Sequence, residues 1–532
     1  MPTQHLSQLM PSCGIMTADP VSYRAATSPH HTACIAIATG ETVSYATLDQ
    51  LIGNCALWLR NTLGQAKSAR VAMLARNSIE QIMLGFACQR VGAIFVPLNW
   101  RLATTELAGL LEDCTPSLFI CEAEFEQTAR TAAGALPLQF ILSDELKSKI
   151  AHSRATDVLA STSVDADAPC MLLYTSGTTG LPKGAIVTCR NAFYSALNFA
   201  FVGEIGPGTV ALSDLPQFHT IGIIAVARTT LMMGGTLVIS DRFVPARTLS
   251  CLSDSKLGVT HYFGVPQIAS ALINDPTIAM ADLTRLHAIF VGGAPLSQAL
   301  IEAYLAKGLA LVNGYGMSEA GTVMHVPIGK QFVRDNPGSI GLPAPLMELR
   351  LVGADGTIVK DGEVGEIQLR GPSVTTGYWN KPEETAAAFV DGWYRTGDLA
   401  KRQANGFYRL TDRLKDMYIS GGENVYPAEV EAVIAAHPDV LDVAVIGTAD
   451  ALWGECGVAF VVARKDRPIL PAQIAVYCET KLARFKQPSH IFLIDAIPRG
   501  ASGKILKQIL RQRSELVSLS PTTKTPSPVK RS

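Results

Sequence analysis

The chain has 532 residues, of which 48% are hydrophobic and only 17% are charged, against about 25% charged in an average soluble protein. This composition excludes an intrinsically disordered chain, and the length predicts two or more domains, because single cores rarely extend beyond about 250–300 residues. The 45 basic and 46 acidic side chains give a formal net charge of −1. Without a basic excess, we expect no nucleic-acid partner.

The 11 cysteines are scattered and form no Cys-x-x-Cys pair, which predicts reduced, buried thiols in a cytoplasmic protein. The first residues lack the charged and apolar regions of a secretory signal. The longest apolar run, residues 219–239, is interrupted by Arg228 and by glycines. An unpaired arginine is costly inside a bilayer, so this run predicts buried core and no integral membrane segment.

Strands and helices alternate in the early part of the chain. Residues 70–75 predict a strand, residues 78–90 a helix behind a Ser cap, and residues 93–97 a second strand. The same unit returns as a strand at 287–291, a helix at 297–306 and a strand at 309–312. This alternation predicts parallel sheets that are joined by helical crossovers.

The pattern changes in the last third of the chain. Residues 348–370 contain short alternating strands with Asp-Gly turns, which predicts a small antiparallel subdomain. A mixed α/β segment follows, with helices that begin at Pro427 and span 472–482, and with strands at 440–446 and 457–462. The end of the chain is rich in Ser, Thr and Pro, so we expect a disordered tail over residues 517–532.

Residues 174–184, YTSGTTGLPKG, follow an apolar strand at 170–173. Glycines let backbone N–H groups approach a phosphate, hydroxyls donate hydrogen bonds to it, and Lys183 adds positive charge. The segment therefore predicts a phosphate-binding loop. Pro182 stands where the common P-loop needs its second glycine, which disfavours an ordinary ATPase or kinase that cleaves the γ-phosphate.

Five further motifs follow in order: GGAPLS at 292–297, GYGMSEAG at 314–321, YRTGDLA at 394–400, DRLKDMYISGGENVYPAEVE at 412–431 and PRGASGKILK at 498–507. With these motifs the chain, from about Val21 to Leu510, resembles the adenylate-forming superfamily of acyl-CoA synthetases, aryl-CoA ligases, peptide-synthetase adenylation domains and luciferases. It looks most like bacterial fatty-acyl-CoA synthetases. The resemblance implies an acid–thiol ligase that uses ATP, Mg²⁺ and coenzyme A.

The resemblance also implies the fold. We expect an α/β protein with a large N-terminal AMP-binding domain over residues 1–413, made of stacked α/β sheets and the small antiparallel β-subdomain. A small mobile α+β domain is expected over residues 414–516, with a hinge near Lys415. We also allow for a homodimer.

Three neighbouring residues carry chemistry that suits a nucleotide. Tyr315 offers an aromatic face for a purine, Ser318 a hydroxyl for the α-phosphate, and Glu319 a hard oxygen ligand for Mg²⁺. The resemblance assigns the same roles, adds Thr175 to the metal site, and expects Asp398 and Arg413 at the ribose. The other expected cofactor-binding residues are Ser176, Gly177, Thr178, Thr179, Gly180, Lys183, Gly292, Gly293, Ala294, Gly314, Gly316, Gly421, Gly422 and Trp453.

Lys504 lies in a Gly-flanked segment and matches the catalytic lysine of the family. When a carboxylate attacks the α-phosphate of ATP, charge builds on the phosphoryl oxygens and the leaving pyrophosphate, so a placed cation stabilises the transition state. The resemblance implies that the C-terminal domain rotates about Lys415 after this step. Gly421 and Gly422 would then face coenzyme A.

Residues 215–222, LPQFHTIG, bear on the substrate. Amino-acid-activating relatives carry an aspartate in this segment for the substrate ammonium group, whereas here it holds Phe218 and His219, and Asp214 lies outside it. We therefore expect a carboxylic acid without an α-amine, with His219 orienting or gating the acyl chain. The apolar neighbours suit a fatty acid and an aryl or arylpropenoic acid alike, and the resemblance to bacterial fatty-acyl-CoA synthetases ranks a medium or long-chain fatty acid first. The alternatives are an aryl or arylpropenoic acid–CoA ligase, an acyl-AMP ligase that loads a separate carrier protein, and a non-catalytic acyl-binding protein.

Overall fold

The computed structural model describes residues 16–17, 19–64, 68–151, 164–175, 182–293, 296–413, 416–420, 423–450, 453–479, 481–500 and 504–518. The chain divides into two compact units. The first comprises Met1–Arg350, Gln368–Thr396 and Ala404–Tyr408, and the second comprises Leu351–Ile367, Gly397–Gln403 and Arg409–Ser532. The domain boundary predicted after residue 413 stays a prediction, because Leu414 and Lys415 lie outside the described residues.

The first unit contains a six-stranded sheet of order β10-β9-β5-β4-β6-β7, in which all pairs are parallel except β9 with β10. Its strands are β4 (Arg70–Leu74), β5 (Ile94–Leu98), β6 (Leu118–Cys121), β7 (Gln139–Leu142), β9 (Pro169–Thr175) and β10 (Lys183–Thr188). The strand–helix–strand unit predicted for residues 70–97 is confirmed. Its helix, α3 (Ile79–Val91), begins where the Ser78 hydroxyl accepts a hydrogen bond from the Gln81 N–H at 3.2 Å, and it ends at Gly92 in the left-handed region.

A nine-stranded sheet of order β17-β16-β15-β14-β13-β11-β12-β2-β3 is parallel between β15 and β2 and antiparallel at both edges. Its strands are β2 (Thr32–Ala36), β3 (Thr42–Ser44), β11 (Val210–Ser213), β12 (Thr236–Ile239), β13 (His261–Gly264), β14 (Ala288–Gly292), β15 (Leu311–Met317), β16 (Gly321–His325) and β17 (Leu342–Pro343). The predicted parallel sheets are thus confirmed. The strand expected at 309–312 extends through Met317 and so includes the first half of the GYGMSEAG motif.

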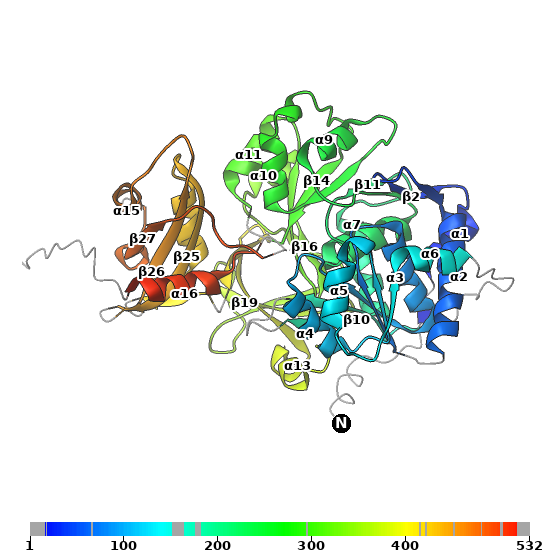
Figure 1. The fold of residues 1–532 in the computed structure, drawn as a ribbon. Coiled ribbons are helices and arrows are strands. Elements are labelled where there is room, and N and C mark those ends of the chain that lie inside the picture. Colours follow the sequence, from blue (N-terminus) through cyan, green and yellow to red (C-terminus); the bar gives the residue numbers. More distant parts are fainter. Residues whose placement is uncertain are drawn as a thin grey trace, which may run out of the picture. The chain divides into compact units, whose positions relative to one another are not determined.

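The helices of the first unit cover these sheets (Figure 1). They are α1 (Pro20–Thr27), α2 (Tyr45–Leu63), α3, α4 (Thr104–Cys114), α5 (Glu126–Ala133), α6 (Ser143–Ala151), α7 (Cys189–Val202), α8 (Thr229–Met233), α9 (Pro245–Ser253), α10 (Pro266–Asn274), α11 (Gln298–Ala306), α12 (Lys330–Asp335) and α13 (Pro382–Ala388). Short 3₁₀ turns lie at η1 (Ala123–Phe125) and η3 (Pro276–Ala279), strands β1 (Met16–Thr17) and β8 (Val164–Asp165) pair, and a π-helix, η2, spans Ile221–Arg228. Helix α7 contacts both β10 and β16, so it connects the two sheets.

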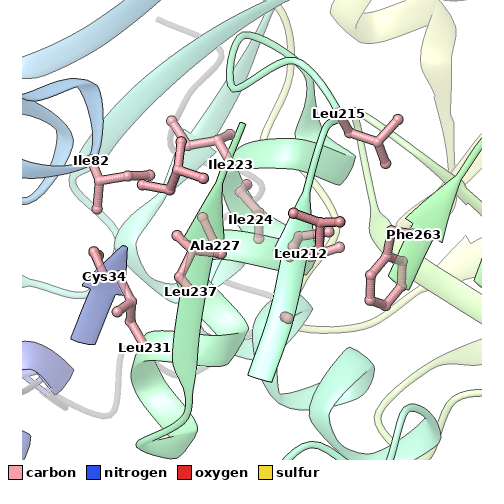
Figure 2. Packing of buried hydrophobic residues seen from close by; sticks show 14 of the residues in the cluster. Cys34, Ile82, Leu212, Leu215, Ile223, Ile224, Ala227, Leu231, Leu237 and Phe263 are labelled. Atoms are coloured by element: carbon pink, nitrogen blue, oxygen red, sulfur yellow. The ribbon is translucent and has the colours of Figure 1, made fainter. Parts of the chain in front are cut away.

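The apolar run at residues 219–239 is buried core, as expected. It forms the π-helix η2, helix α8 and strand β12, and Figure 2 shows Ile223 and Ile224 packed among residues of β11, β12 and α3. Arg228 is buried there, donates a hydrogen bond to Gln89 at 2.9 Å and lies over the Phe86 ring. Among the described helices, none is both long and apolar enough to cross a bilayer. The ten described cysteines are buried and form no disulfide.

A small five-stranded sheet has the order β18-β19-β21-β20, with β22 paired to β21. Its strands are β18 (Glu348–Val352), β19 (Gly365–Arg370), β20 (Phe389–Val390), β21 (Trp393–Arg402) and β22 (Tyr408–Arg413). The expected turns occur, with Gly356 and Gly362 at positive φ.

The second unit contains a further sheet of order β24-β23-β26-β25, with β27 parallel to β26 (orange to red in Figure 1). Its elements are β23 (Tyr418–Ser420), β24 (Glu423–Val425), α14 (Pro427–Ala435), β25 (Val440–Asp450), β26 (Gly454–Ala463), α15 (Pro471–Glu479), η4 (Arg484–Lys486), β27 (His490–Leu493) and α16 (Lys507–Ser518). Side chains of β25 alternate between two cores: Val443 and Val445 pack with residues of α14 and α15, whereas Ala444 and Ile446 pack with Leu510 of α16.

Candidate functional site

The phosphate-binding loop predicted at 174–184 is carried by the hairpin of β9 and β10. Thr175 ends β9 and pairs in register with Lys183, the first residue of β10. The Thr175 hydroxyl donates a hydrogen bond to the Lys183 carbonyl at 3.4 Å. The hairpin therefore fixes both ends of the loop. The residues between them to which sequence analysis assigns phosphate contacts, Ser176, Gly177, Thr178, Thr179 and Gly180, lie outside the described residues.

A segment that sequence analysis did not single out runs along the outer side of β10. The Ile186 N–H donates to the Gly377 carbonyl at 3.0 Å, and the Trp379 N–H donates to the Gly184 carbonyl at 2.8 Å. These bonds place the Tyr378 ring beside the loop, with the Lys183 ammonium 5.4 Å from the ring centroid, within the range of a cation–π contact. Tyr378 thus orients the lysine expected to bind phosphate.

Tyr378 also contacts the expected magnesium ligand. Its hydroxyl donates a hydrogen bond to Oε1 of Glu319 at 3.0 Å and lies 2.9 Å from the Tyr394 hydroxyl. Glu319 is only 8% exposed, and its carbonyl accepts the Thr375 N–H at 2.6 Å. Burial and then the negative charge of Glu319 raise the pKa of Tyr378 above its usual value, so the phenol keeps its proton and remains a donor.

Ser318 and Glu319 lie in the turn that joins β15 to β16, where Met317 pairs with Gly321. Tyr315, the expected purine-stacking residue, is on β15 and 8% exposed. Gly292 of β14 pairs in parallel register with Gly314 of β15.

Gly292 ends the parallel strand β14, and the carboxyl ends of parallel strands are the usual position of ligand sites in open α/β sheets. Gly293 follows β14, and Gly316 follows Tyr315 on β15. Ala294 lies outside the described residues.

His219 lies between β11 and the π-helix η2. Its N–H donates to the Pro216 carbonyl at 3.1 Å, and its carbonyl accepts the Ile223 N–H at 3.0 Å. These two backbone hydrogen bonds hold His219 in a fixed turn. The helix that follows is a π-helix, a rare element that often marks a functional site.

Asp214 is not available to a substrate ammonium group in this arrangement. It is buried, and its Oδ2 accepts hydrogen bonds from the Thr248 hydroxyl at 2.7 Å and the Tyr262 hydroxyl at 3.0 Å. Burial raises the pKa of Asp214. The expectation of a substrate without an α-amine is therefore consistent with this carboxylate's place in the core.

The second unit carries the remaining predicted residues on separate elements. Asp398 is buried on β21, next to Gly397, whose N–H donates to Glu366 at 3.2 Å. Trp453 is half-buried, and its N–H donates to the Asp450 carboxylate at 2.9 Å. For Arg413 only the backbone at the end of β22 is described, and Gly421 and Gly422 lie outside the described residues.

Lys504 is exposed at the end of a short backbone ladder. Its carbonyl accepts the Gly500 N–H at 2.8 Å, and the Leu506 N–H donates to Pro498 at 2.9 Å. These bonds hold the backbone from Lys504 to Leu506 against residues 498–500.

The residues fit a magnesium nucleotide. Magnesium prefers one or two carboxylates together with phosphate oxygens, and Glu319 supplies a carboxylate that Tyr378 orients. Lys183 supplies a cation that the same tyrosine holds.

Comparisons with known proteins identify the family. The model of the AMP-binding enzyme family matches residues 21–379, and that of the AMP-binding enzyme C-terminal domain matches residues 429–504. A feruloyl-CoA synthase of Amycolatopsis sp is 38% identical over 490 residues, which are 92% of this chain and 97% of the relative. The long-chain-fatty-acid–CoA ligase FadD13 of Mycobacterium tuberculosis is 35% identical over 498 residues, which are 92% and 97% of the two chains.

The structure of o-succinylbenzoate coenzyme A synthetase (MenE) from Bacillus subtilis, in complex with ATP and magnesium ion, superimposes with a TM-score of 0.82 at 30% identity. The match covers 93% of this chain and 99% of that one. From these matches along nearly its whole length, the chain belongs to the family of AMP-binding enzymes.

Proposed function

We propose that the protein is an ATP-dependent acid–CoA ligase. A carboxylic acid and ATP give an acyl-adenylate and pyrophosphate, and coenzyme A then displaces AMP to form the acyl-CoA thioester. The observation that carries this proposal is that Tyr378 contacts both Lys183 and Glu319. These residues lie beside the hairpin of β9 and β10, which carries the predicted phosphate-binding loop. The family match and the ligase activity named for its relatives support it.

In the first half-reaction, Lys183 and the hairpin hold the phosphates, and Tyr315 and Asp398 hold the adenosine. Magnesium, when bound by Glu319 and Thr175, would neutralise charge on the phosphate oxygens. Ser318 donates to the α-phosphate, and His219 orients the acid. Lys504 stabilises the charge that develops as the carboxylate attacks and pyrophosphate leaves. Arg413 supports the ribose.

In the second half-reaction, the thiol of coenzyme A attacks the acyl carbonyl and AMP leaves. We assign Gly421, Gly422 and Trp453 to the coenzyme A path, and a hinge to Lys415. The absence of side chains at the paired glycines suits the passage of a narrow pantetheine arm. Trp453 gains a fixed backbone from Asp450.

For the acid, we propose an aromatic or arylpropenoic carboxylate. The feruloyl-CoA synthase supports this choice with its 38% identity. The strands β13 and β14 end at Gly264 and Gly292, and Gly314 of β15 pairs in register with Gly292. This choice departs from the fatty acid that sequence analysis ranks first.

A medium or long-chain fatty acid is the second candidate. FadD13 is 35% identical over nearly the same span. The partly buried Ile221 and the buried Ile223 and Ile224 beside His219 are apolar enough for either class of acid.

The test is product release by the purified chain with ATP and Mg²⁺ over a panel of ferulate, benzoate, octanoate, palmitate and phenylalanine. We expect pyrophosphate release with ferulate or benzoate, followed by AMP release only after coenzyme A is added. Preference for octanoate or palmitate would favour the second candidate. AMP release with a carrier protein but not with coenzyme A would show a carrier-loading ligase, and no pyrophosphate with any acid would contradict the proposal.

A further inference from the structure

A small cavity in the first unit is lined in part by Ser318 and Glu319 of the turn between β15 and β16. Its walls come from β10, the start of α7, the start of the π-helix and residues 373–375. The cavity volume is about 10 Å³, which is room for a single water molecule. It is therefore too small for the acid or the nucleotide.

Two hydroxyls that line this cavity have no hydrogen-bond partner among the described residues. They belong to Ser195 on α7, which is 2% exposed, and to Thr220 before the π-helix, which is 7% exposed. A buried hydroxyl without a partner is unfavourable, so buried polar groups of native proteins nearly always bond to protein or to ordered water. A polar group in the cavity would supply the partner that each hydroxyl lacks.

Three other polar side chains of the wall bond elsewhere. The Asn191 amide donates to the Pro372 and Val374 carbonyls at 3.0 and 2.7 Å. The Thr375 hydroxyl donates to the Ile186 carbonyl at 2.6 Å, and the Ser373 hydroxyl lies 3.1 Å from the Met347 sulfur. These groups therefore do not satisfy Ser195 and Thr220.

Ser195 also touches the strand that leaves the Glu319 turn. Gly321 begins β16 with φ of +67°, and a Cβ atom placed there would lie 1.8 Å from the Ser195 hydroxyl oxygen. Only a glycine permits this approach. The position of Ser195 therefore limits where the turn from Met317 to Gly321 can lie.

We infer that Ser195 and Thr220 together bind one buried water molecule, and that through this water and the contact with Gly321 they position the Ser318–Glu319 turn for the magnesium nucleotide. Ser195 is on this account a positioning residue, because it does not itself contact the substrate. The functional part rests on the proposed adenylation. The water site itself does not depend on it.

The first experiment is a crystal structure of the wild-type protein and of Ser195→Ala. We expect ordered density within hydrogen-bond distance of the Ser195 and Thr220 hydroxyls in the wild type and its loss in the variant. A wild-type cavity that is empty, with both hydroxyls bonded to protein atoms, would overturn the inference whether or not the protein adenylates an acid.

The second experiment measures the Mg²⁺ concentration for half-maximal pyrophosphate release. Ser195→Ala should raise it about 10-fold, the lower end of the effect of removing an outer-shell partner of a metal ligand, and leave the KM for the acid unchanged. The matched control is Ser213→Ala, which removes a buried hydroxyl that also has no partner among the described residues but lies on β11 outside the cavity. It should leave the Mg²⁺ requirement unchanged.

A double-mutant cycle separates one shared water from two independent hydroxyls. If Ser195 and Thr220 hold the same water, Ser195→Ala with Thr220→Val should raise the Mg²⁺ requirement no further than the larger single change. Additive effects would contradict a shared water. If the wild type releases no pyrophosphate with any acid, the proposed function fails while the crystallographic result still decides the water site.

Discussion

The Tyr378 hydroxyl donates a hydrogen bond to Oε1 of Glu319 at 3.0 Å, while the ring of the same tyrosine lies 5.4 Å from the Lys183 ammonium. One side chain thus contacts both the expected magnesium ligand and the expected phosphate-binding lysine. Because burial and Glu319 raise its pKa, Tyr378 remains protonated at neutral pH and keeps this donor role.

Tyr378→Phe should therefore impair adenylation and keep the fold. Hydrogen bonds to charged groups contribute about 1.5–3 kcal/mol, so we expect roughly a 10-fold or greater loss of kcat/KM for Mg-ATP. The matched control is Tyr304→Phe, which removes a hydroxyl bonded to the Ala269 carbonyl at 2.8 Å in the core. If both variants lost activity to the same extent, Tyr378 would have only a structural role.

Lys504→Ala should separate the two half-reactions. Removing a preorganised charge at the transition state commonly costs about 10²–10³-fold in rate, so acid-dependent pyrophosphate release should fall by that order. Thioester formation from supplied acyl-adenylate should continue. Lys504 is exposed, so folding should not suffer, and the exposed Lys465→Ala serves as the control. Equal losses in both half-reactions would refute this division of roles.

Gly222→Ala should destabilise the first unit. A Cβ atom at Gly222 would lie 2.2 Å from the Pro216 carbonyl oxygen, so the turn that holds His219 would have to shift. Overpacking of this kind costs about 1–3 kcal/mol in the free energy of unfolding. Gly208→Ala meets no atom within 4 Å and is the control. Urea unfolding measures the difference, and equal midpoints for the two variants would show that the turn adapts freely.

Stability should fall as the pH drops from about 6.5 to about 4. Burial lowers the pKa of His325 from 6.5 to about 4, and it lowers the pKa of His261 to about the same value. In this interval the unfolded chain binds protons that the folded chain does not, so acid favours unfolding. His325→Gln should flatten the decline of Tm with pH, whereas the exposed His490→Gln should leave it unchanged. A decline as steep in His325→Gln as in the wild type would contradict this account.

Local signals in the sequence were sufficient for much of the fold. Helix α3 begins and ends as its Ser cap and Gly92 indicate, because both act on the backbone beside them. Tyr378 could not be predicted in this way. It reaches Glu319, which lies far away in the chain, only because residues 375–379 pair alongside β10. Its aromatic ring after Thr-Thr-Gly gave no indication of that pairing.

The roles proposed for the Ser195 and Thr220 hydroxyls could not be predicted from the sequence for the same reason. Ser195 is one of several small residues on helix α7, and its proposed role depends on the close approach of Gly321 on β16. Such contacts are long-range, and neither periodicity nor motif spacing reports them.

The measurement that tests the central claim most directly is acid-dependent exchange of labelled pyrophosphate into ATP in the absence of coenzyme A. The exchange requires a reversible step in which the acid attacks the α-phosphate and pyrophosphate leaves. We predict exchange that depends on both Mg²⁺ and a hydrophobic carboxylic acid, and that is lost in Lys504→Ala. Two results would contradict adenylate formation by this protein. One is exchange of pyrophosphate into ATP without acid, and the other is incorporation of label into ATP from orthophosphate but not from pyrophosphate.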